Sequence, residues 1–79
     1  MNMEQTYSTK DLYEASALYA SGMPLSTLKS DGNQFWFIFL NSEECKKISD
    51  GYWRGSLDLN AKKYADAVRT LKDRVFSRK

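Results

Sequence analysis

The stretch QFWFIFL, residues 34 to 40, places six large apolar side chains in succession within a chain of 79 residues. A short apolar run rich in aromatic residues predicts a buried β-strand. Side chains alternate along a strand, so the three phenylalanines face one way and Trp36, Ile38 and Leu40 face the other. Because both faces are apolar, we expect other parts of the chain to cover both. A surface that stacks nucleic-acid bases would need basic residues between the rings, and this run contains none.

The residues before this run predict a helix followed by a hairpin. Ser8 is the expected N-cap of a helix over residues 9 to 21, and a glycine and a proline soon after it end the helix. The dipeptide Asp31-Gly32 favours a tight turn, so an irregular strand should precede it and pair with residues 34 to 40. The EQTYS segment, residues 4 to 8, would add one more short strand in front of the helix.

The residues after the run predict a short helix, a turn and a short strand. Asn41 is the expected N-cap of a helix that ends at Gly51. The sequence YWRG, residues 52 to 55, is predicted to form a turn in which Trp53 packs back onto the sheet. Two leucines then alternate with polar residues over residues 56 to 59, which predicts a short strand.

The last predicted helix has the clearest amphipathic pattern, and Asn60 is its expected N-cap. Its apolar stripe consists of Tyr64, Ala67, Val68, Leu71 and Val75. An outer row of alternating charge consists of Lys62, Asp66, Arg69 and Asp73. Oppositely charged pairs at these spacings stabilise a helix by a few tenths of a kcal/mol, about 0.2 to 0.5 each.

Together these elements predict a single α+β domain over residues 1 to 79. We expect a small antiparallel sheet of three or four strands packed against three helices. If both optional strands form, the order is β-α-β-β-α-β followed by a helix, which is compatible with a split βαβ sheet. The sequence leaves the three-stranded and the four-stranded sheet open.

The composition argues against several kinds of chemistry. The chain has no histidine, the commonest general base, and its one cysteine, Cys45, leaves too few ligands for a zinc site. Cys45 shares a predicted helix face with Ile48, which favours a buried, inert thiol. Helix-dipole effects explain Glu43, Glu44 and Asp50 more simply than a metal site does. We therefore expect no catalytic residue, no metal, no cofactor and no enzymatic activity.

Membrane and secretion signals are also lacking. No apolar stretch approaches the roughly 20 residues of a membrane span, and the first ten residues lack the apolar segment of a signal peptide. A single cysteine provides no intramolecular disulfide, so the usual support of small secreted domains is missing. We therefore expect a cytoplasmic protein without a membrane partner.

The charge is unevenly distributed along the chain. Residues 1 to 53 carry four lysines against seven acidic residues, a net charge of −3, whereas residues 54 to 79 carry eight basic residues against three acidic ones, a net charge of +5. The basic residues of this last third are Arg54, Lys62, Lys63, Arg69, Lys72, Arg74, Arg78 and Lys79. Such a cluster could contact phosphates, although Asp66 and Asp73 interrupt it.

Several short motifs carry a family resemblance. They are Thr9 to Leu12 at a helix start, Phe35 to Phe39 in the aromatic strand, Trp53 to Gly55, and Leu71 with Lys72 in the closing helix. Taken together, they resemble a family of small bacterial and phage proteins that is catalogued only as a domain of unknown function. The resemblance covers nearly the whole chain, implies a bacterial or mobile-element setting, and transfers no catalytic residue.

We therefore predict a small interaction protein rather than an enzyme. Its expected contact surface combines the aromatic turn with the basic last helix, since Tyr, Trp and Arg dominate interface hot spots. The residues predicted to bind a partner are Tyr52, Arg54, Lys62, Lys63, Arg69 and Lys72. A protein partner is expected, self-association is plausible because so small a core gains from further burial, and nucleic-acid binding through the last helix is the alternative.

Overall fold

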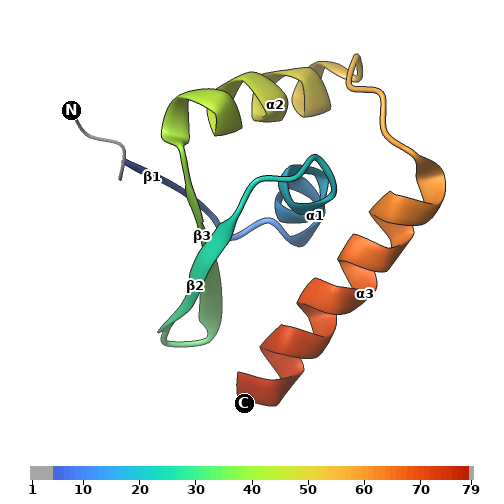
Figure 1. The fold of residues 1–79 in the computed structure, drawn as a ribbon. Helices are drawn as coiled ribbons and strands as arrows, with labels where there is room; N and C mark the ends of the chain where they lie inside the picture. Colours follow the sequence, from blue (N-terminus) through green and yellow to red (C-terminus); the bar gives the residue numbers. More distant parts are fainter. Residues whose placement is uncertain (1–4, 79) are drawn as a thin grey trace.

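A computed structural model describes residues 5 to 78 and contains three strands and three helices (Figure 1). Their order along the chain is β1 Thr6–Thr9, α1 Leu12–Ala20, β2 Leu25–Asp31, β3 Gln34–Leu40, α2 Ser42–Arg54 and α3 Ala61–Arg78. This set of helices and strands confirms the predicted α+β class.

The aromatic run forms the central strand, β3, of a sheet with the order β1-β3-β2. Both outer strands pair antiparallel with β3, so β1 and β2 run parallel to each other on either side of it. Because α1 connects β1 to β2, these elements form a split βαβ unit with β3 inserted. The predicted irregularity of the first hairpin strand is confirmed by a register shift between Leu25 and Thr27.

The core lies between one face of this sheet and the helices. Phe37 and Phe39 point into it and are 2% and 0% exposed. Leu18 of α1, Leu71 of α3 and Cys45 of α2 are fully buried against the same cluster. Helix α1 lies in the middle of the molecule, with α2 and α3 packed on different sides of it (Figure 1). The amphipathic stripe predicted for α3 is therefore confirmed at its centre.

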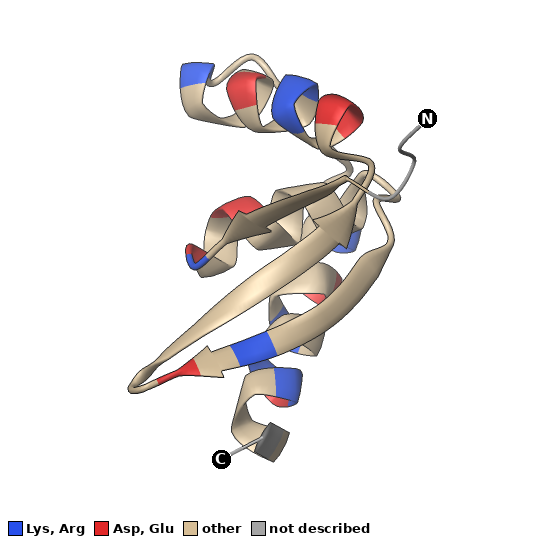
Figure 2. Cartoon of the chain, turned by 90° about the vertical axis from the view of Figure 1, so that its left-hand side faces the viewer, with Lys and Arg blue, Asp and Glu red and all other residues tan. Residues whose placement is uncertain are grey.

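The opposite face of the sheet corrects the expectation that both faces of β3 are covered. Trp36, Ile38 and Leu40 point to this face and are only partly buried. Within residues 5 to 78, no helix crosses this face, which points toward the viewer in Figure 2 while the helices lie behind and above. The physical reason is that α3 packs mainly on α1, so all three helices gather around the inner face and the ends of the sheet.

The second helix is longer than predicted. Helix α2 continues through Gly51 to Arg54, so residues 52 to 54 are helical, and Gly55 ends the helix with a φ of 75°. The linker N–H groups of Ser56 and Leu57 donate to the Gly51 carbonyl oxygen at 2.9 and 3.1 Å. A Cβ on Gly51 would lie 3.5 Å from the Leu57 Cβ, an ordinary van der Waals contact, so the returning linker passes close to Gly51 while the helix continues beyond it.

Two further expectations about this region are wrong. Residues 56 to 60 have no regular structure, so the strand predicted over residues 56 to 59 does not form and the sheet has three strands. Trp53 does not pack on the sheet: it is 61% exposed and meets the Tyr52 ring edge-on at 4.9 Å. The alternation of leucines was a valid strand signal, but hydrogen bonds to the end of α2 hold the linker away from the sheet edge.

The helix caps agree with the sequence in part. Ser8 lies in β1, and α1 instead begins after Asp11, whose Oδ1 accepts a hydrogen bond from the Glu14 N–H at 2.8 Å. Asn60 caps α3 as predicted, since its Oδ1 accepts from the Lys63 N–H at 3.0 Å. Asn41 stands at the start of α2, but it has a φ of 70° and its side chain makes no capping bond.

Candidate functional site

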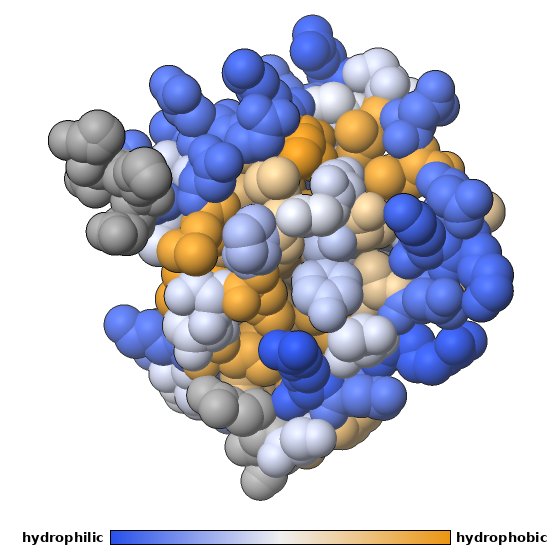
Figure 3. Space-filling view, viewed as in Figure 1, coloured by the Kyte–Doolittle hydropathy of each residue, from blue (hydrophilic) through white to orange (hydrophobic). Residues whose placement is uncertain are grey.

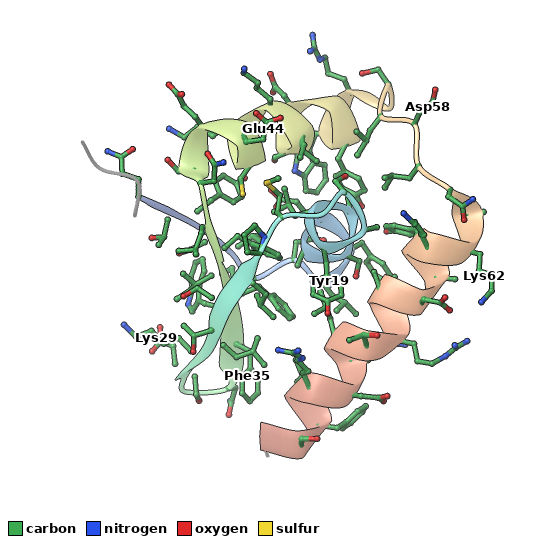
Figure 4. All side chains as sticks on the ribbon, viewed as in Figure 1. Tyr19, Lys29, Phe35, Glu44, Asp58 and Lys62 are labelled. Atoms are coloured by element: carbon green, nitrogen blue, oxygen red, sulfur yellow. The ribbon has the colours of Figure 1, made fainter. Side chains whose placement is uncertain are left out.

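An open groove runs between the C-terminal half of α3, the tip of the β2–β3 hairpin and the start of α1. It has a volume of about 690 Å³. Its lining residues are Lys10, Asp11, Leu12, Asn33, Gln34, Phe35, Phe37, Lys72, Val75 and Phe76. Apolar side chains form most of its surface, and Phe35 points from β3 toward α3 (Figure 4). We call this feature the α3 groove.

The groove exists because the apolar stripe of α3 is longer than the surface that covers it. Leu71 is fully buried, Val75 one turn later is only partly buried, and Phe76 is 66% exposed. Helix α1 has nine residues against eighteen in α3, so it supports only part of the longer helix. The remaining apolar turns of α3 lie opposite Phe35 and leave an apolar surface accessible from outside.

Charged groups lie at the rim of this apolar surface. Lys72 contributes one positive charge and Asp11 contributes one negative charge. Lys10 also lines the groove, but its ammonium lies over the Trp36 ring on the other face of the sheet. The Asp11 carboxylate is engaged in capping α1. The groove is thus apolar at its floor, with one cation, Lys72, on the wall that α3 forms. On the face seen in Figure 3, hydrophilic side chains gather over the outer sides of α2 and α3 while apolar ones lie between them.

A second accessible feature lies on the open face of the sheet. Trp36 of β3 is the cross-strand partner of Lys29 of β2, so both side chains project from the same face. Lys10, just after β1, places its Nζ 5.6 Å from the centroid of the Trp36 ring. Lys29 points away from the helices (Figure 4). Two lysines from separate segments therefore flank the one tryptophan of the sheet.

The most buried polar cluster surrounds Glu14, which is 5% exposed. Its carboxylate accepts hydrogen bonds from the Tyr7 hydroxyl at 2.5 Å, the Ser49 hydroxyl at 2.6 Å and the Thr9 hydroxyl at 2.7 Å. Burial first, and the hydrogen bond to Glu14 second, raise the pKa of Tyr7 above its usual 10.0. Because internal donors occupy both carboxylate oxygens, this cluster fastens β1, α1 and α2 together and offers no open position for a substrate.

Cys45 is the only thiol of the chain and is fully buried, as predicted. Burial first, then the negative charges of Glu44 and Glu14, raise the pKa of its thiol above 9.0. A raised pKa keeps the thiol protonated at neutral pH, and only the thiolate is a good nucleophile. Within the part of the chain that the structure describes, no group of three histidine, cysteine or acidic side chains is arranged to hold a metal ion.

The residues predicted to bind a partner lie on several sides of the molecule. Tyr52 lines a hollow at the linker between α2 and α3, together with Tyr64. Burial is the first cause that raises the pKa of Tyr64, and the neighbouring Tyr52 is the second. Arg54 is exposed, with its Nη2 4.0 Å from Asp50 Oδ2. Lys63 lines a separate hollow beside α1, and Lys72 alone of the six reaches the α3 groove.

Two of the predicted basic residues share one acidic partner. The Asp66 carboxylate forms ion pairs with Lys62 Nζ at 3.2 Å and with Arg69 Nη1 at 3.4 Å. This confirms the predicted row of alternating charge over its first three members, and it lowers the positive potential of the outer side of α3. Lys79 and the side chain of Arg78, which belong to the same basic third, lie outside the described residues.

Sequence reasoning missed most of the α3 groove. The phenylalanine at position 35 was assigned to the core together with the rest of its run, and Phe76 lies just outside the stripe read from the helical period. One signal was present: the stripe of α3 extends farther than a helix as short as α1 can cover.

Comparison with known proteins gives one match. A family described as "Domain of unknown function (DUF5659)" matches residues 4–77, which is nearly the whole chain. The chain belongs to this family. The match confirms the resemblance stated from the helix start, the aromatic strand and the closing helix, and the family description names no activity. No curated protein and no solved structure matches the chain. Among the described helices, none has both the length and the apolarity that crossing a bilayer requires.

Proposed function

We propose that this protein is a small, non-enzymatic binding protein that holds an apolar segment of a partner protein in the α3 groove. The observation that carries the proposal is the falling burial toward the end of α3: Leu71 is fully buried, Val75 on the same stripe is partly buried, and Phe76 beside the stripe is 66% exposed. An apolar stripe that continues beyond its own core gains free energy when a partner covers it. The setting predicted from the sequence, a cytoplasmic protein of a bacterium or phage, is part of this proposal.

The shape of the groove favours a peptide segment over a small molecule. Small-molecule sites usually enclose most of their ligand, whereas the α3 groove is open along its length. An amphipathic helix of a partner fits such a surface, with apolar anchors on neighbouring turns meeting Phe35, Val75 and Phe76. An acidic residue flanking these anchors would lie near Lys72, which provides a complementary charge at the groove.

The nucleic-acid alternative through α3 has weaker support. Asp66 neutralises part of the charge of Lys62 and Arg69, and Lys63 and Lys72 project on different sides of the same helix. A helix that binds duplex nucleic acid needs its cations on one face.

The proposal is tested by selecting helix-forming peptides from a random library displayed on phage, with the immobilised protein as bait. We expect selected peptides to carry apolar residues three or four positions apart, with an Asp or Glu next to them that can meet Lys72. Binding of one selected peptide is then measured by fluorescence anisotropy against variants of the protein. Phe76→Ser should weaken it about tenfold, since burying the exposed part of a phenylalanine is worth about 1 to 2 kcal/mol. Adding Lys72→Glu to this variant should weaken peptide binding further.

The matched controls change the same residue types elsewhere on the surface. Trp53→Ser removes another exposed aromatic ring, and Lys62→Glu reverses another exposed lysine, so both should leave the affinity within twofold. Thermal melting of each variant shows whether it is folded. Peptides whose binding is insensitive to Phe76→Ser and Lys72→Glu, or a failure to select any peptide, would refute the use of the groove.

A further inference from the structure

The open face of the sheet carries a second site, on the side of β3 opposite the α3 groove. Lys10 just after β1, Trp36 of β3 and Lys29 of β2 lie side by side, with the aromatic ring in the middle. Both lysines are exposed, the ring is partly buried, and a hollow of about 470 Å³ adjoins it. The hollow is lined by Ser8, Lys29, Ser30, Asp31, Trp36 and Ile38.

From this arrangement we infer that the open face binds single-stranded nucleic acid, with one base stacked on Trp36 and the two flanking phosphates near Lys10 and Lys29. Stacking on an aromatic ring together with lysine contacts to the backbone is the general chemistry of single-strand recognition. Neighbouring strands lie about 4.8 Å apart, so the two lysine positions are separated by about 10 Å across the ring. This distance allows one nucleotide to lie between them.

In the structure, the Lys10 ammonium group lies over the Trp36 ring in a cation–π contact. A base that stacks on the ring displaces this ammonium, which then pairs with a phosphate. The exchange is favourable because an exposed cation–π contact is weaker than base stacking, and a charge-assisted bond to phosphate replaces it.

Charge and hydrogen bonding around the ring are consistent with this ligand. Asp31 is the acidic residue of the adjoining hollow, and it lies two residues beyond Lys29 toward the hairpin tip. Its carboxylate repels phosphate, so the backbone should pass beside the two lysines and leave Asp31 to accept hydrogen bonds from base amino groups. The hydroxyls of Ser8 and Ser30 provide further polar contacts for a sugar or base.

The site differs from the one expected on α3. The objection that the aromatic run contains no basic residue applies to the strand alone, because lysines from β2 and from the end of β1 supply the missing charges. The inference is independent of the α3 groove, since alternate residues of β3 serve the two faces: Phe35 lines the groove, and Trp36 lies on the open face.

The test uses fluorescein-labelled ten-nucleotide oligomers of deoxycytidine and of cytidine, measured by anisotropy against the full chain at low salt. We expect binding of both. Two neutralised phosphates predict a slope of about −1.4 for log affinity against log salt, or a loss of about sevenfold between 50 and 200 mM. In a Trp53→Phe background Trp36 is the sole tryptophan, so its fluorescence should be quenched in parallel with the anisotropy change.

Variants separate this face from the rest of the surface. Trp36→Ala should weaken binding at least about tenfold, whereas Trp36→Phe should retain most of it because a stacking ring remains. Lys29→Glu should weaken binding and flatten the salt dependence. The double variant Lys62→Glu with Arg69→Glu reverses more charge on α3 and should leave the affinity within twofold.

Three results would overturn the inference. One is the absence of any anisotropy change at low salt with either oligomer. Another is binding that survives Trp36→Ala and Lys29→Glu but is lost in the α3 double variant. The third is duplex DNA binding as tightly as the single strand, because paired bases cannot stack on Trp36.

Discussion

The buried carboxylate of Glu14 provides the sharpest test of how this small fold is stabilised. Tyr7, Thr9 and Ser49 each donate a hydroxyl to it, and these residues belong to β1 and α2. Glu14→Ala removes the acceptor from all three. The Tyr7 and Ser49 hydroxyls can still pair with each other at 3.0 Å, so about two donors lose their partner.

A buried donor left without a partner costs about 1 to 3 kcal/mol. Part of this cost is offset because the variant no longer buries a charged carboxylate, which is itself unfavourable. We therefore expect Glu14→Ala to lower the free energy of unfolding by about 2 to 4 kcal/mol. A domain of this length has a total stability of roughly 4 to 12 kcal/mol, so the loss is a large fraction. Glu14→Gln keeps one acceptor and the side-chain shape, so its loss should be about 1 to 2 kcal/mol.

The assay is equilibrium unfolding in urea at pH 7, followed by circular dichroism. With a slope of about 1 kcal/mol per molar urea, Glu14→Ala should lower the midpoint by at least about 2 M. The matched control is Asp58→Asn, which removes an exposed carboxylate in the linker after α2 (Figure 4). A Glu14→Ala protein that unfolds at the same urea concentration as this control would refute the role assigned to the carboxylate.

Three further changes test other parts of the fold. The pKa values of Tyr7 and Cys45 are raised in the folded state above their ordinary values of 10.0 and 9.0. The stability that these two groups contribute is therefore present below the ordinary values and is lost as pH rises through the raised ones. Urea midpoints should fall between about pH 8.5 and 11, and a flat profile would contradict this. Leu71→Ala removes a fully buried side chain and should cost about 2 to 5 kcal/mol by thermal or urea unfolding, whereas a cost below about 1 kcal/mol would mean that α3 is not docked as described. Asn60→Ala should cost about 1 kcal/mol through loss of its cap, while Asn41→Gly should be neutral or slightly stabilising because Asn41 has a positive φ and no side-chain capping bond; equal effects at the two sites would contradict the different roles of these asparagines.

Local patterns predicted most of the elements because their causes are local. The hairpin was predicted from Asp31-Gly32, although its two turn residues are Gly32 and Asn33 because Asp31 pairs with Gln34. The cap of α3 followed from Asn60, and the buried thiol from the position of Cys45 on a helix face. Where prediction failed, two local signals competed. Gly51 and Gly55 are both possible helix ends, and the helix ends at Gly55, which has a positive φ and is followed by linker N–H groups that donate to the Gly51 carbonyl oxygen.

The candidate sites were less predictable than the fold. Of the residues predicted to bind a partner, Lys72 alone lies in the α3 groove, because helical period gives the face of a residue but not what lies opposite it. The Glu14 cluster was missed for a similar reason. Its donors are 7, 5 and 35 residues away along the chain, and nothing in the local sequence brings them together.

By itself, the sequence determined that residues 34 to 40 form the central strand and that Phe37 and Phe39 are core, since a run this apolar in so short a chain must be buried on at least one side. Only the tertiary structure decided which side. Burial of the second face depends on where the helices pack, and here α3 packs on α1 instead of crossing the sheet. That choice leaves Trp36 on an open face between Lys10 and Lys29, and leaves the end of the α3 stripe uncovered as a groove.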